Sequence, residues 1–135
     1  MAVLLNPYLG FRDNAREALE FYHEVFGGDL EISTYASMGM GAPEESEKVM
    51  HGMIRSDDLA LMAADTPNEQ HHTPGSSISL SLSGDDDAVL RGYWEALSAS
   101  GQELMPLNVA PWGDSFGMCI DKFGISWMVN IAGKK

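Results

Sequence analysis

Three side chains with acid–base or nucleophilic chemistry lie close together near the end of the chain. They are Asp114, Cys119 and Asp121, in the stretch Trp-Gly-Asp-Ser-Phe-Gly-Met-Cys-Ile-Asp-Lys-Phe-Gly-Ile-Ser-Trp, residues 112–127. Paired carboxylates can act as general acid and base, and a thiolate can act as a nucleophile. Cys119 has no cationic residue beside it to stabilise a thiolate, so we expect it to behave as a small hydrophobic residue. The segment Asp-Lys-Phe-Gly favours a turn, which makes Asp121 a turn residue and leaves Asp114 and Trp112 as candidate ligand contacts.

The elements that position these residues occur twice along the chain. An offset of 71 relates residues 9–26 to residues 80–97 without a gap, and an offset of 66 relates residues 54–62 to residues 120–128. The offset decreases because the first half contains a longer loop at residues 37–48. Such an internal repeat predicts two copies of one structural unit.

Each half has the pattern of a strand, a helix and three further strands. The first helix has Asp13 or Asn14 as its cap and ends at Gly27, and the second begins in the acidic run 84–87 and ends before Gly101. The expected strands are 3–11, 29–36, 48–55, 59–65, 76–83, 103–110, 115–121 and 125–132. We therefore predict an α+β fold in one domain, with a first module at about 1–66, a linker at 67–75 and a second module at 76–132.

The composition excludes several classes of protein. The formal net charge is −12, with only 8 Lys and Arg, which argues against binding to nucleic acid. No stretch approaches the roughly 20 apolar residues that a membrane span needs. A single cysteine excludes an intrachain disulfide. We expect a soluble, cytoplasmic protein whose partners include neither nucleic acid nor a membrane.

The motifs resemble those of the vicinal oxygen chelate superfamily, which includes glyoxalase I, bleomycin and fosfomycin resistance proteins and extradiol dioxygenases. The residues that carry the resemblance are Pro-Tyr-Leu-Gly-Phe at 7–11, Ala-Leu-Glu-Phe-Tyr at 18–22 with the following Phe-Gly-Gly, and the two motifs within 112–127. The chain is most similar to the PhnB-like branch, often labelled 3-demethylubiquinone 3-methyltransferase-like. The resemblance implies two βαβββ modules forming curved mixed sheets around a cavity, helices outside, and a homodimer. No glycine-rich turn of a nucleotide site is present, so we do not expect S-adenosylmethionine.

In metal-using members of this superfamily, four side chains on strands facing the cavity hold the ion. Carried over by residue, these positions are Asn6, Met62, Ser77 and Met128. Divalent ions are bound by carboxylate, imidazole or thiolate ligands, whereas thioethers, an amide and a hydroxyl add no charge. We therefore expect no bound metal and no other cofactor.

Strand alternation predicts which side chains face the cavity, because successive side chains point to opposite faces. The residues predicted to face the helices are Leu5, Pro7, Leu9, Phe11, Met50, Gly52, Ile54, Ile78, Leu80, Leu82, Phe116, Met118, Ile120, Ile125, Trp127 and Val129. The residues predicted to face the cavity are Asn6, Tyr8, Gly10, Val49, His51, Met53, Ser77, Ser79, Ser81, Cys119 and Met128.

Two readings of His51 stay open. It either acts as a general base or binds an anionic ligand in the cavity, or it is hydrogen-bonded to a neighbouring strand or to Tyr8. The Tyr8 hydroxyl is suited to orienting a ligand oxygen, and methionines such as Met53 supply an adaptable lining.

The first hypothesis is a metal-free cavity protein that binds or sequesters a small organic ligand. The acidity of the chain and its Met-rich loop, which contains Met38 and Met40, fit a cationic and partly apolar compound. The candidate binding residues are Asn6, Tyr8, Met53, Met62, Ser77, Ser79, Trp112, Asp114 and Met128. The rival hypothesis is an enzyme that depends on metal through unrecognised donors, or that is metal-free with His51 as base.

Overall fold

The computed structural model describes residues 3–41, 43–57, 59–67, 70 and 72–133. The chain divides into two compact units, Met1–Thr73 and Pro74–Lys135. The boundary lies within the expected linker, where the described residues form neither helix nor strand.

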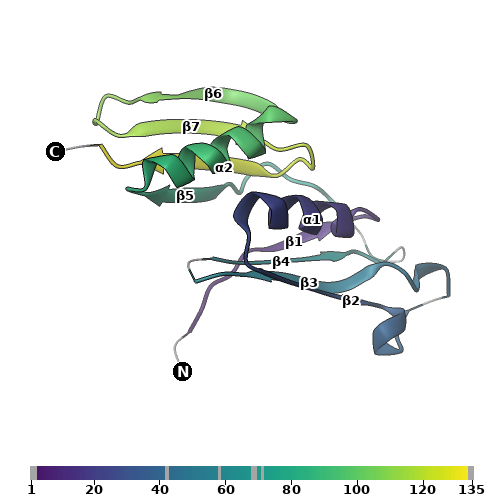
Figure 1. The fold of residues 1–135 in the computed structure, drawn as a ribbon. Coiled ribbons are helices and arrows are strands. Elements are labelled where there is room, and N and C mark those ends of the chain that lie inside the picture. The colour runs from purple at the N-terminus through teal and green to yellow at the C-terminus, as the bar shows by residue number, and fades with distance from the viewer. Residues whose placement is uncertain (1–2, 42, 58, 68–69, 71, 134–135) are drawn as a thin grey trace. The chain divides into compact units, whose positions relative to one another are not determined.

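The first unit consists of one helix packed on a four-stranded mixed sheet (Figure 1). Its elements are β1 (Tyr8–Phe11), α1 (Ala15–Phe26), β2 (Asp29–Thr34), the 3-10 turns η1 (Ala36–Met38) and η2 (Pro43–Glu45), β3 (Val49–Arg55) and β4 (Ala60–Asp65). The strand order is β1-β4-β3-β2, with β1 parallel to β4 and the other pairs antiparallel. Within this unit α1 covers one face of the sheet, and no other α-helix of the described residues covers the second face, which is called the open face below.

The core of this unit lies between α1 and the sheet. The helix buries Ala15, Ala18, Leu19, Tyr22 and Phe26, which recur at helical spacing. Under the helix, Ile54 pairs with Leu61 and Gly52 pairs with Ala63, and these four residues are also buried. A Cβ added to Gly52 would collide with Leu19 Cδ1, so glycine allows the helix to approach β3 closely.

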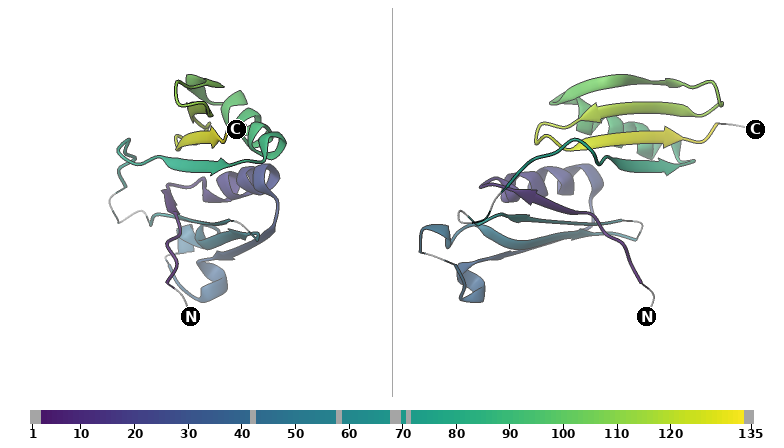
Figure 2. Two further views of the ribbon diagram at one scale, coloured as in Figure 1. Left: turned by 90° about the vertical axis from the view of Figure 1, so that its left-hand side faces the viewer. Right: turned by 180° about the vertical axis from the view of Figure 1, so that it is seen from behind.

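The second unit repeats this arrangement (Figures 1 and 2). Its elements are β5 (Leu80–Gly84), α2 (Asp87–Ala99), β6 (Gln102–Val109), β7 (Ser115–Ile120) and β8 (Ser126–Ile131). The strand order is β5-β8-β7-β6, again with one parallel pair, β5 with β8. The predicted α+β fold of two βαβββ modules is confirmed.

The two helices are capped differently. At α2, the Asp86 side chain accepts a hydrogen bond from Val89 N at 3.2 Å, as the acidic run predicts. At α1, neither predicted residue provides the cap: Asn14 is the N-cap residue, but its side chain makes no capping bond. Instead, Asp65 Oδ1 at the end of β4 accepts from Ala15 N at 2.9 Å.

The first strand of each unit is shorter than predicted. Residues 3–7 and 76–79 precede β1 and β5, and they lie outside the assigned strands. Leu5 is 99% exposed and Ile78 is 78% exposed, so the prediction that they pack under the helices is wrong. The alternation of residue types thus extends beyond the residues that are assigned to the strands.

In β7, the predicted faces are reversed. Paired residues of antiparallel strands lie on the same face, and Gly117 pairs with Val129 while Cys119 pairs with Trp127. All four are buried, and a Cβ added to Gly117 would lie 2.9 Å from Trp94 Cη2 of α2. Cys119 therefore faces the helix and not a cavity. The alternate residues of β7, Phe116, Met118 and Ile120, lie on the open face, with Met118 opposite Met128.

A β-bulge in β3 shows that the predicted direction of the Val49 side chain is wrong. Ser33 pairs with His51 and Thr34 with Val49, so Met50 is an extra residue that interrupts the alternation. Val49 is fully buried, with its N–H donating to Asp65 Oδ2 at 3.0 Å, and is not a cavity residue. Beyond the bulge the prediction is correct for Gly52 and Ile54, which are buried.

The strand register also changes the correspondence between the two units. Tyr8 lies beside Met62, and Ser81 lies beside Met128. The structural counterpart of Tyr8 is therefore Ser81, whereas the offset of 71 predicts Ser79. Ser79 and Ser81 are two residues apart, so they lie on the same face of the sheet at different points along the chain.

Candidate functional site

A cavity of about 670 Å³ lies in the first unit, at the end of β1 and β4 where the loop after β2 and the linker meet. The sheet contributes Tyr8, Gly10, Ala64 and Asp65. The loop contributes Tyr35, Met40, Gly41, Glu44 and Glu45. Thr66 and the linker residues Pro67 and Gln70 complete the lining. The volume is in the range of small-molecule sites in proteins.

Tyr8 and His51 form a pair on the open face of the sheet. The Tyr8 hydroxyl lies 3.1 Å from His51 Nδ1, and the ring centroids are 5.7 Å apart. Burial raises the pKa of the Tyr8 phenol, so this group keeps its proton. The second of the two readings of His51, a hydrogen bond to Tyr8, therefore describes the observed contact, and the pair adjoins the cavity through Tyr8.

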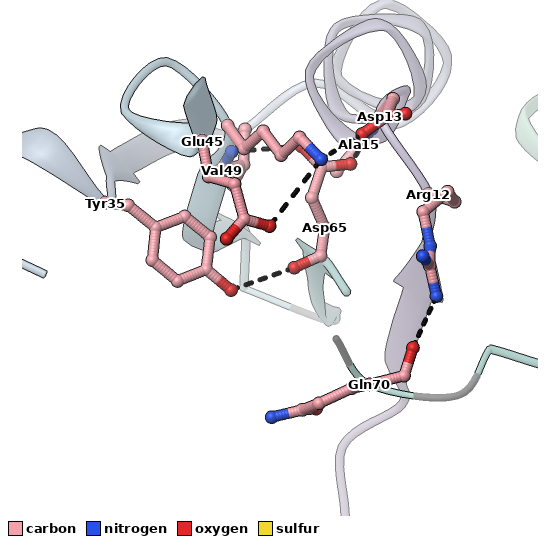
Figure 3. Close-up of polar contacts among 9 residues, drawn as sticks. Arg12, Asp13, Ala15, Tyr35, Glu45, Val49, Asp65 and Gln70 are labelled. Carbon is pink, nitrogen blue, oxygen red and sulfur yellow. Dashed lines mark hydrogen bonds and ion pairs between the residues drawn. The ribbon is translucent and has the colours of Figure 1, made fainter. Parts of the chain in front are cut away.

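Tyr35 and Asp65 both line the cavity and are joined by a hydrogen bond (Figure 3). The Tyr35 hydroxyl donates to the Asp65 carbonyl oxygen at 3.0 Å. The Asp65 carboxylate is buried and accepts from Ala15 N and Val49 N, so the same residue holds the helix start, the start of β3 and the tyrosine. Burial raises the pKa of Tyr35, and the charges of Glu45 and Asp65 raise it further.

The described part of the cavity lining is acidic. It includes the carboxylates Glu44, Glu45 and Asp65, and none of its described members is a lysine or arginine. Lys48 Nζ lies outside the lining, 2.6 Å from Asp13 Oδ1 and 3.7 Å from Glu45 Oε2. Glu44 is exposed, and its carboxylate is therefore available to a molecule in the cavity.

The Arg12 and His72 side chains make contacts between the linker and the first strand. Arg12 donates through Nη2 to the Gln70 carbonyl oxygen at 2.6 Å (Figure 3). His72 Nε2 lies 3.1 Å from the Gly10 carbonyl oxygen, on β1. These contacts hold the linker against the first strand.

The predicted site residues of the first unit lie on the open face or before it. Tyr8 lines the cavity, and His51 is bonded to it. Met53 and Met62 are cross-strand partners, and Arg55 Nη2 lies 3.3 Å from Met53 Sδ. Asn6 precedes β1 and is half-buried. The structure thus brings Tyr8, His51, Met53 and Met62 together on one face of one sheet.

The remaining predicted residues lie in the second unit. Ser77 and Ser79 precede β5 and are exposed, and the Ser79 hydroxyl lies 2.7 Å from that of Ser126. Met128 is half-buried in β8.

Trp112 and Asp114 lie in the loop between β6 and β7, and Asp114 directly precedes β7. The Trp112 side chain is 61% exposed, and its ring meets Phe116 edge to face at 5.7 Å. Asp114 Oδ2 accepts from Asn130 Nδ2 at 3.0 Å, and Oδ1 accepts from Gly133 N at 2.8 Å. These bonds give Asp114 a structural role at the end of the sheet.

The four positions predicted to correspond to metal ligands carry donors that do not fit a divalent ion. They hold two thioethers, an amide and a hydroxyl, which are soft or neutral donors. Among the residues that the structure describes, no group of three or more His, Cys, Asp and Glu side chains is arranged to hold a metal. No helix in the described part of the chain is long and apolar enough to cross a membrane.

Sequence reasoning missed most of the lining residues, including four from the loop and the linker that carry polar groups. These four are Tyr35, Glu44, Glu45 and Gln70. The loop at residues 37–48 was recognisable by its length and charge, and Met40 was identified there as a lining residue. Loop residues have no periodicity from which the direction of a side chain follows, so the carboxylates could not be placed.

Comparisons with known proteins agree with this architecture. Residues 4–130 match the protein family described as 3-demethylubiquinone-9 3-methyltransferase. The chain is 34% identical to PA1353 of Pseudomonas aeruginosa, with a TM-score of 0.90, over 98% of this chain and 100% of that chain. It is 26% identical to a putative 3-demethylubiquinone-9 3-methyltransferase, PhnB protein, of Bacillus cereus, with a TM-score of 0.74, over 96% and 100%.

Protein YjdN of Escherichia coli (strain K12) is 26% identical over 142 residues, which cover 94% of each chain. At the level of the fold alone, the chain resembles a member of the glyoxalase/bleomycin resistance protein/dioxygenase superfamily from Sphaerobacter thermophilus. That structure is 16% identical, with a TM-score of 0.57, and the match covers 96% of this chain and 98% of that one.

Proposed function

This chain belongs to the PhnB-like 3-demethylubiquinone-9 3-methyltransferase family and has the glyoxalase fold, and on this premise we propose that it binds a cationic, partly apolar organic molecule in the cavity of its first unit. The observation that carries the proposal is the acidic lining of that cavity. Glu44 and Glu45 supply negative charge, and Tyr8, Tyr35 and Met40 supply apolar and aromatic surface. Cations are attracted both to carboxylates and to aromatic faces.

The family's description names a methyl transfer, which we do not assign to this chain. The connections from β1 to α1 and from β5 to α2 contain the acidic residues Asp13, Asp85 and Asp86 in place of a glycine-rich anion-binding turn. We therefore propose binding or sequestration, without S-adenosylmethionine and without a bound metal.

A thermal-shift screen tests the proposal. Aromatic amines, aromatic carboxylates and neutral aromatic compounds of matched size are compared, and the amines are expected to raise the melting temperature most, because a ligand that binds only the folded state stabilises it. Glu44→Gln is expected to reduce the shift. Glu47→Gln is the matched control, since Glu47 is also exposed in the loop but does not line this cavity.

The screen has a clear negative outcome. Equal stabilisation by cationic and anionic compounds, or no stabilisation by any compound at high concentration, would contradict a cation-binding cavity. If both glutamine variants lose the ligand-induced rise in melting temperature, the effect comes from the overall negative charge of the loop and not from the cavity.

An enzyme is the second candidate, because His51 lies beside the cavity and bonds the hydroxyl of a lining residue. In this alternative His51 acts as general base, or a metal is held by donors not identified above. Metal analysis of untagged protein addresses the latter. Stoichiometric zinc, manganese, nickel or iron would replace the metal-free proposal.

We also propose a homodimer. Residues before the first strand leave apolar side chains exposed, with Val3 at 98% and Leu5 at 99%. Large exposed apolar surface is typical of protein interfaces. Sedimentation velocity tests the state of assembly, and a monomer at micromolar concentration would refute it.

A further inference from the structure

We propose that the cavity selects ligands that carry N–H donors, such as a protonated primary amine, because both of its tyrosine oxygens present lone pairs and not protons. The inference rests on the proposed function, since it concerns the same cavity. It adds a rule of recognition: a quaternary ammonium has the same charge as a primary ammonium but no N–H to donate. Tyr8 and Tyr35 are the residues that make this distinction.

The proton of Tyr35 is already used. Its hydroxyl donates to the Asp65 carbonyl oxygen at 3.0 Å, and a phenol has only one O–H. The Tyr35 oxygen can therefore act toward the cavity only as an acceptor. Glu44 and Glu45, which share the lining, are acceptors as well when ionised.

The proton of Tyr8 is used in the same way while His51 is neutral. The Tyr8 oxygen and His51 Nδ1 lie 3.1 Å apart, and in this proposal the hydroxyl is the donor, with the proton of the neutral imidazole on Nε2. The remaining lone pairs of Tyr8, which is 52% exposed, are open to the cavity that it lines. An ammonium group near the two phenols would thus meet acceptor lone pairs on both phenol oxygens.

Protonation of His51 reverses the role of Tyr8. Both ring nitrogens of the charged imidazole are donors, so Nδ1–H donates to the Tyr8 oxygen and the phenol proton turns toward the cavity. The ligand then meets a donor beside a positive charge. The selectivity for N–H donors is therefore expected to be lower in the form of the protein that has His51 protonated.

The charged and titratable groups around His51 come from several elements. On the open face of the sheet, Glu31 lies opposite Met53, and Asp29 lies opposite Arg55. The cavity adds Tyr35, Glu44 and Glu45, and His72 is bonded to Gly10 on β1. The Asp65 carboxylate is occupied by Ala15 N and Val49 N.

Two probes of equal charge test the selectivity: benzylammonium and benzyltrimethylammonium. Their dissociation constants are measured at pH 8 by calorimetry for the wild type, Tyr8→Phe and Tyr35→Phe. Each substitution is expected to weaken benzylammonium binding about fivefold, the effect of one hydrogen bond, and to leave benzyltrimethylammonium unchanged. Tyr93→Phe, in α2 of the second unit, is the matched control and is expected to change neither constant.

The role of His51 is tested by pH and by the free protein. The pH is lowered from 8 while the protonation of His51 is followed by NMR, and its protonation is expected to move the ratio of the two constants about fivefold against benzylammonium in the wild type. In His51→Asn, whose amide oxygen accepts throughout this pH range, the ratio is expected to stay constant. Long-range ¹H–¹⁵N NMR of the ligand-free protein is expected to show neutral His51 protonated at Nε2, with this preference reduced in Tyr8→Phe.

The outcomes separate this inference from the proposed function. If neither cation binds at any pH, both are overturned. If both cations bind but Tyr8→Phe and Tyr35→Phe weaken them equally, the cavity binds cations and the selectivity rule is wrong. A neutral His51 protonated at Nδ1 would overturn the assigned role of Tyr8 without any ligand measurement.

Discussion

Asp121 holds Trp127 across the turn between β7 and β8: its Oδ2 accepts from the indole N–H at 2.8 Å, and both residues are buried. Its Oδ1 accepts from Phe123 N at 2.8 Å and from Ile125 N at 3.1 Å. The carboxylate therefore satisfies three donors of one hairpin. The prediction that Asp121 is a turn residue is confirmed, and its bond to the indole extends that role into the core.

Replacement of Asp121 by Asn is expected to lower the free energy of unfolding by about 2–4 kcal/mol. The amide of Asn retains one acceptor oxygen but points an N–H₂ group at a donor, and an unmatched buried polar group is costly. Urea denaturation measures the loss. Asp85→Asn, at an exposed position before α2, is the control and is expected to be neutral.

Replacement of Asp65 by Asn is expected to cost about 2 kcal/mol, because either Ala15 N or Val49 N loses its acceptor. Hydrogen exchange is expected to accelerate at these two amides in particular. Asp57→Asn, exposed in the same unit, is the control. Unchanged exchange at Ala15 and Val49 would show that Asp65 does not hold the helix start.

Two glycine substitutions are expected to have opposite effects. A Cβ at Gly117 would lie 2.9 Å from Trp94 and 3.0 Å from Leu107 Cα, so Gly117→Ala is expected to cost about 1–3 kcal/mol through overpacking. A Cβ at Gly92 in α2 has no neighbour within 4 Å, so Gly92→Ala is expected to add about 0.5–1 kcal/mol through helix propensity. Equal effects in chemical denaturation would contradict the placement of Gly117 under the helix.

Cys119 is expected to be unreactive in the native protein. Burial raises the pKa of its thiol to about 11 from an ordinary 9.0, and the charges of Asp121 and Glu103 add to the effect. At pH 8 a disulfide reagent is expected to modify it only after unfolding. The Cys119 thiol loses its proton at a higher pH in the folded state than in the unfolded state. Its contribution to the free energy of unfolding therefore decreases as the pH rises from about 9 to about 11. In Cys119→Ala, the free energy of unfolding measured by urea denaturation is expected to decrease less over this pH range than in the wild type.

Much of the fold was predictable because the repeat, the helical spacing and the turn residues agree with one another. The helix predicted to end at Gly27 and the turn at Asp121 are examples in which a short local pattern determines the structure. The face of Cys119 was not predictable by alternation alone. It depends on which residues pair across the hairpin, and a shift of register by one residue exchanges the two faces of a strand.

The candidate site was predictable only where strands carry it. Alternation placed Tyr8, His51 and Met53 on the open face, and their contacts agree with that placement. Val49 was misplaced because the bulge at Met50 leaves no signal in the residue types around it. The acidic lining depends on the path of the loop through Glu44, which the sequence pattern does not specify.

The two ways of capping the helices imply different folding histories for the two units. Asp86 and Val89 are three residues apart, so α2 can be capped as soon as its own turn forms. Ala15 and Asp65 are 50 residues apart, so the first turn of α1 obtains its acceptor only when β4 has joined the sheet. Contacts of high sequence separation form slowly because a long loop must close first. Nucleation is therefore favoured around α2, and Asp65→Asn should act mainly on the rate of unfolding of the first unit.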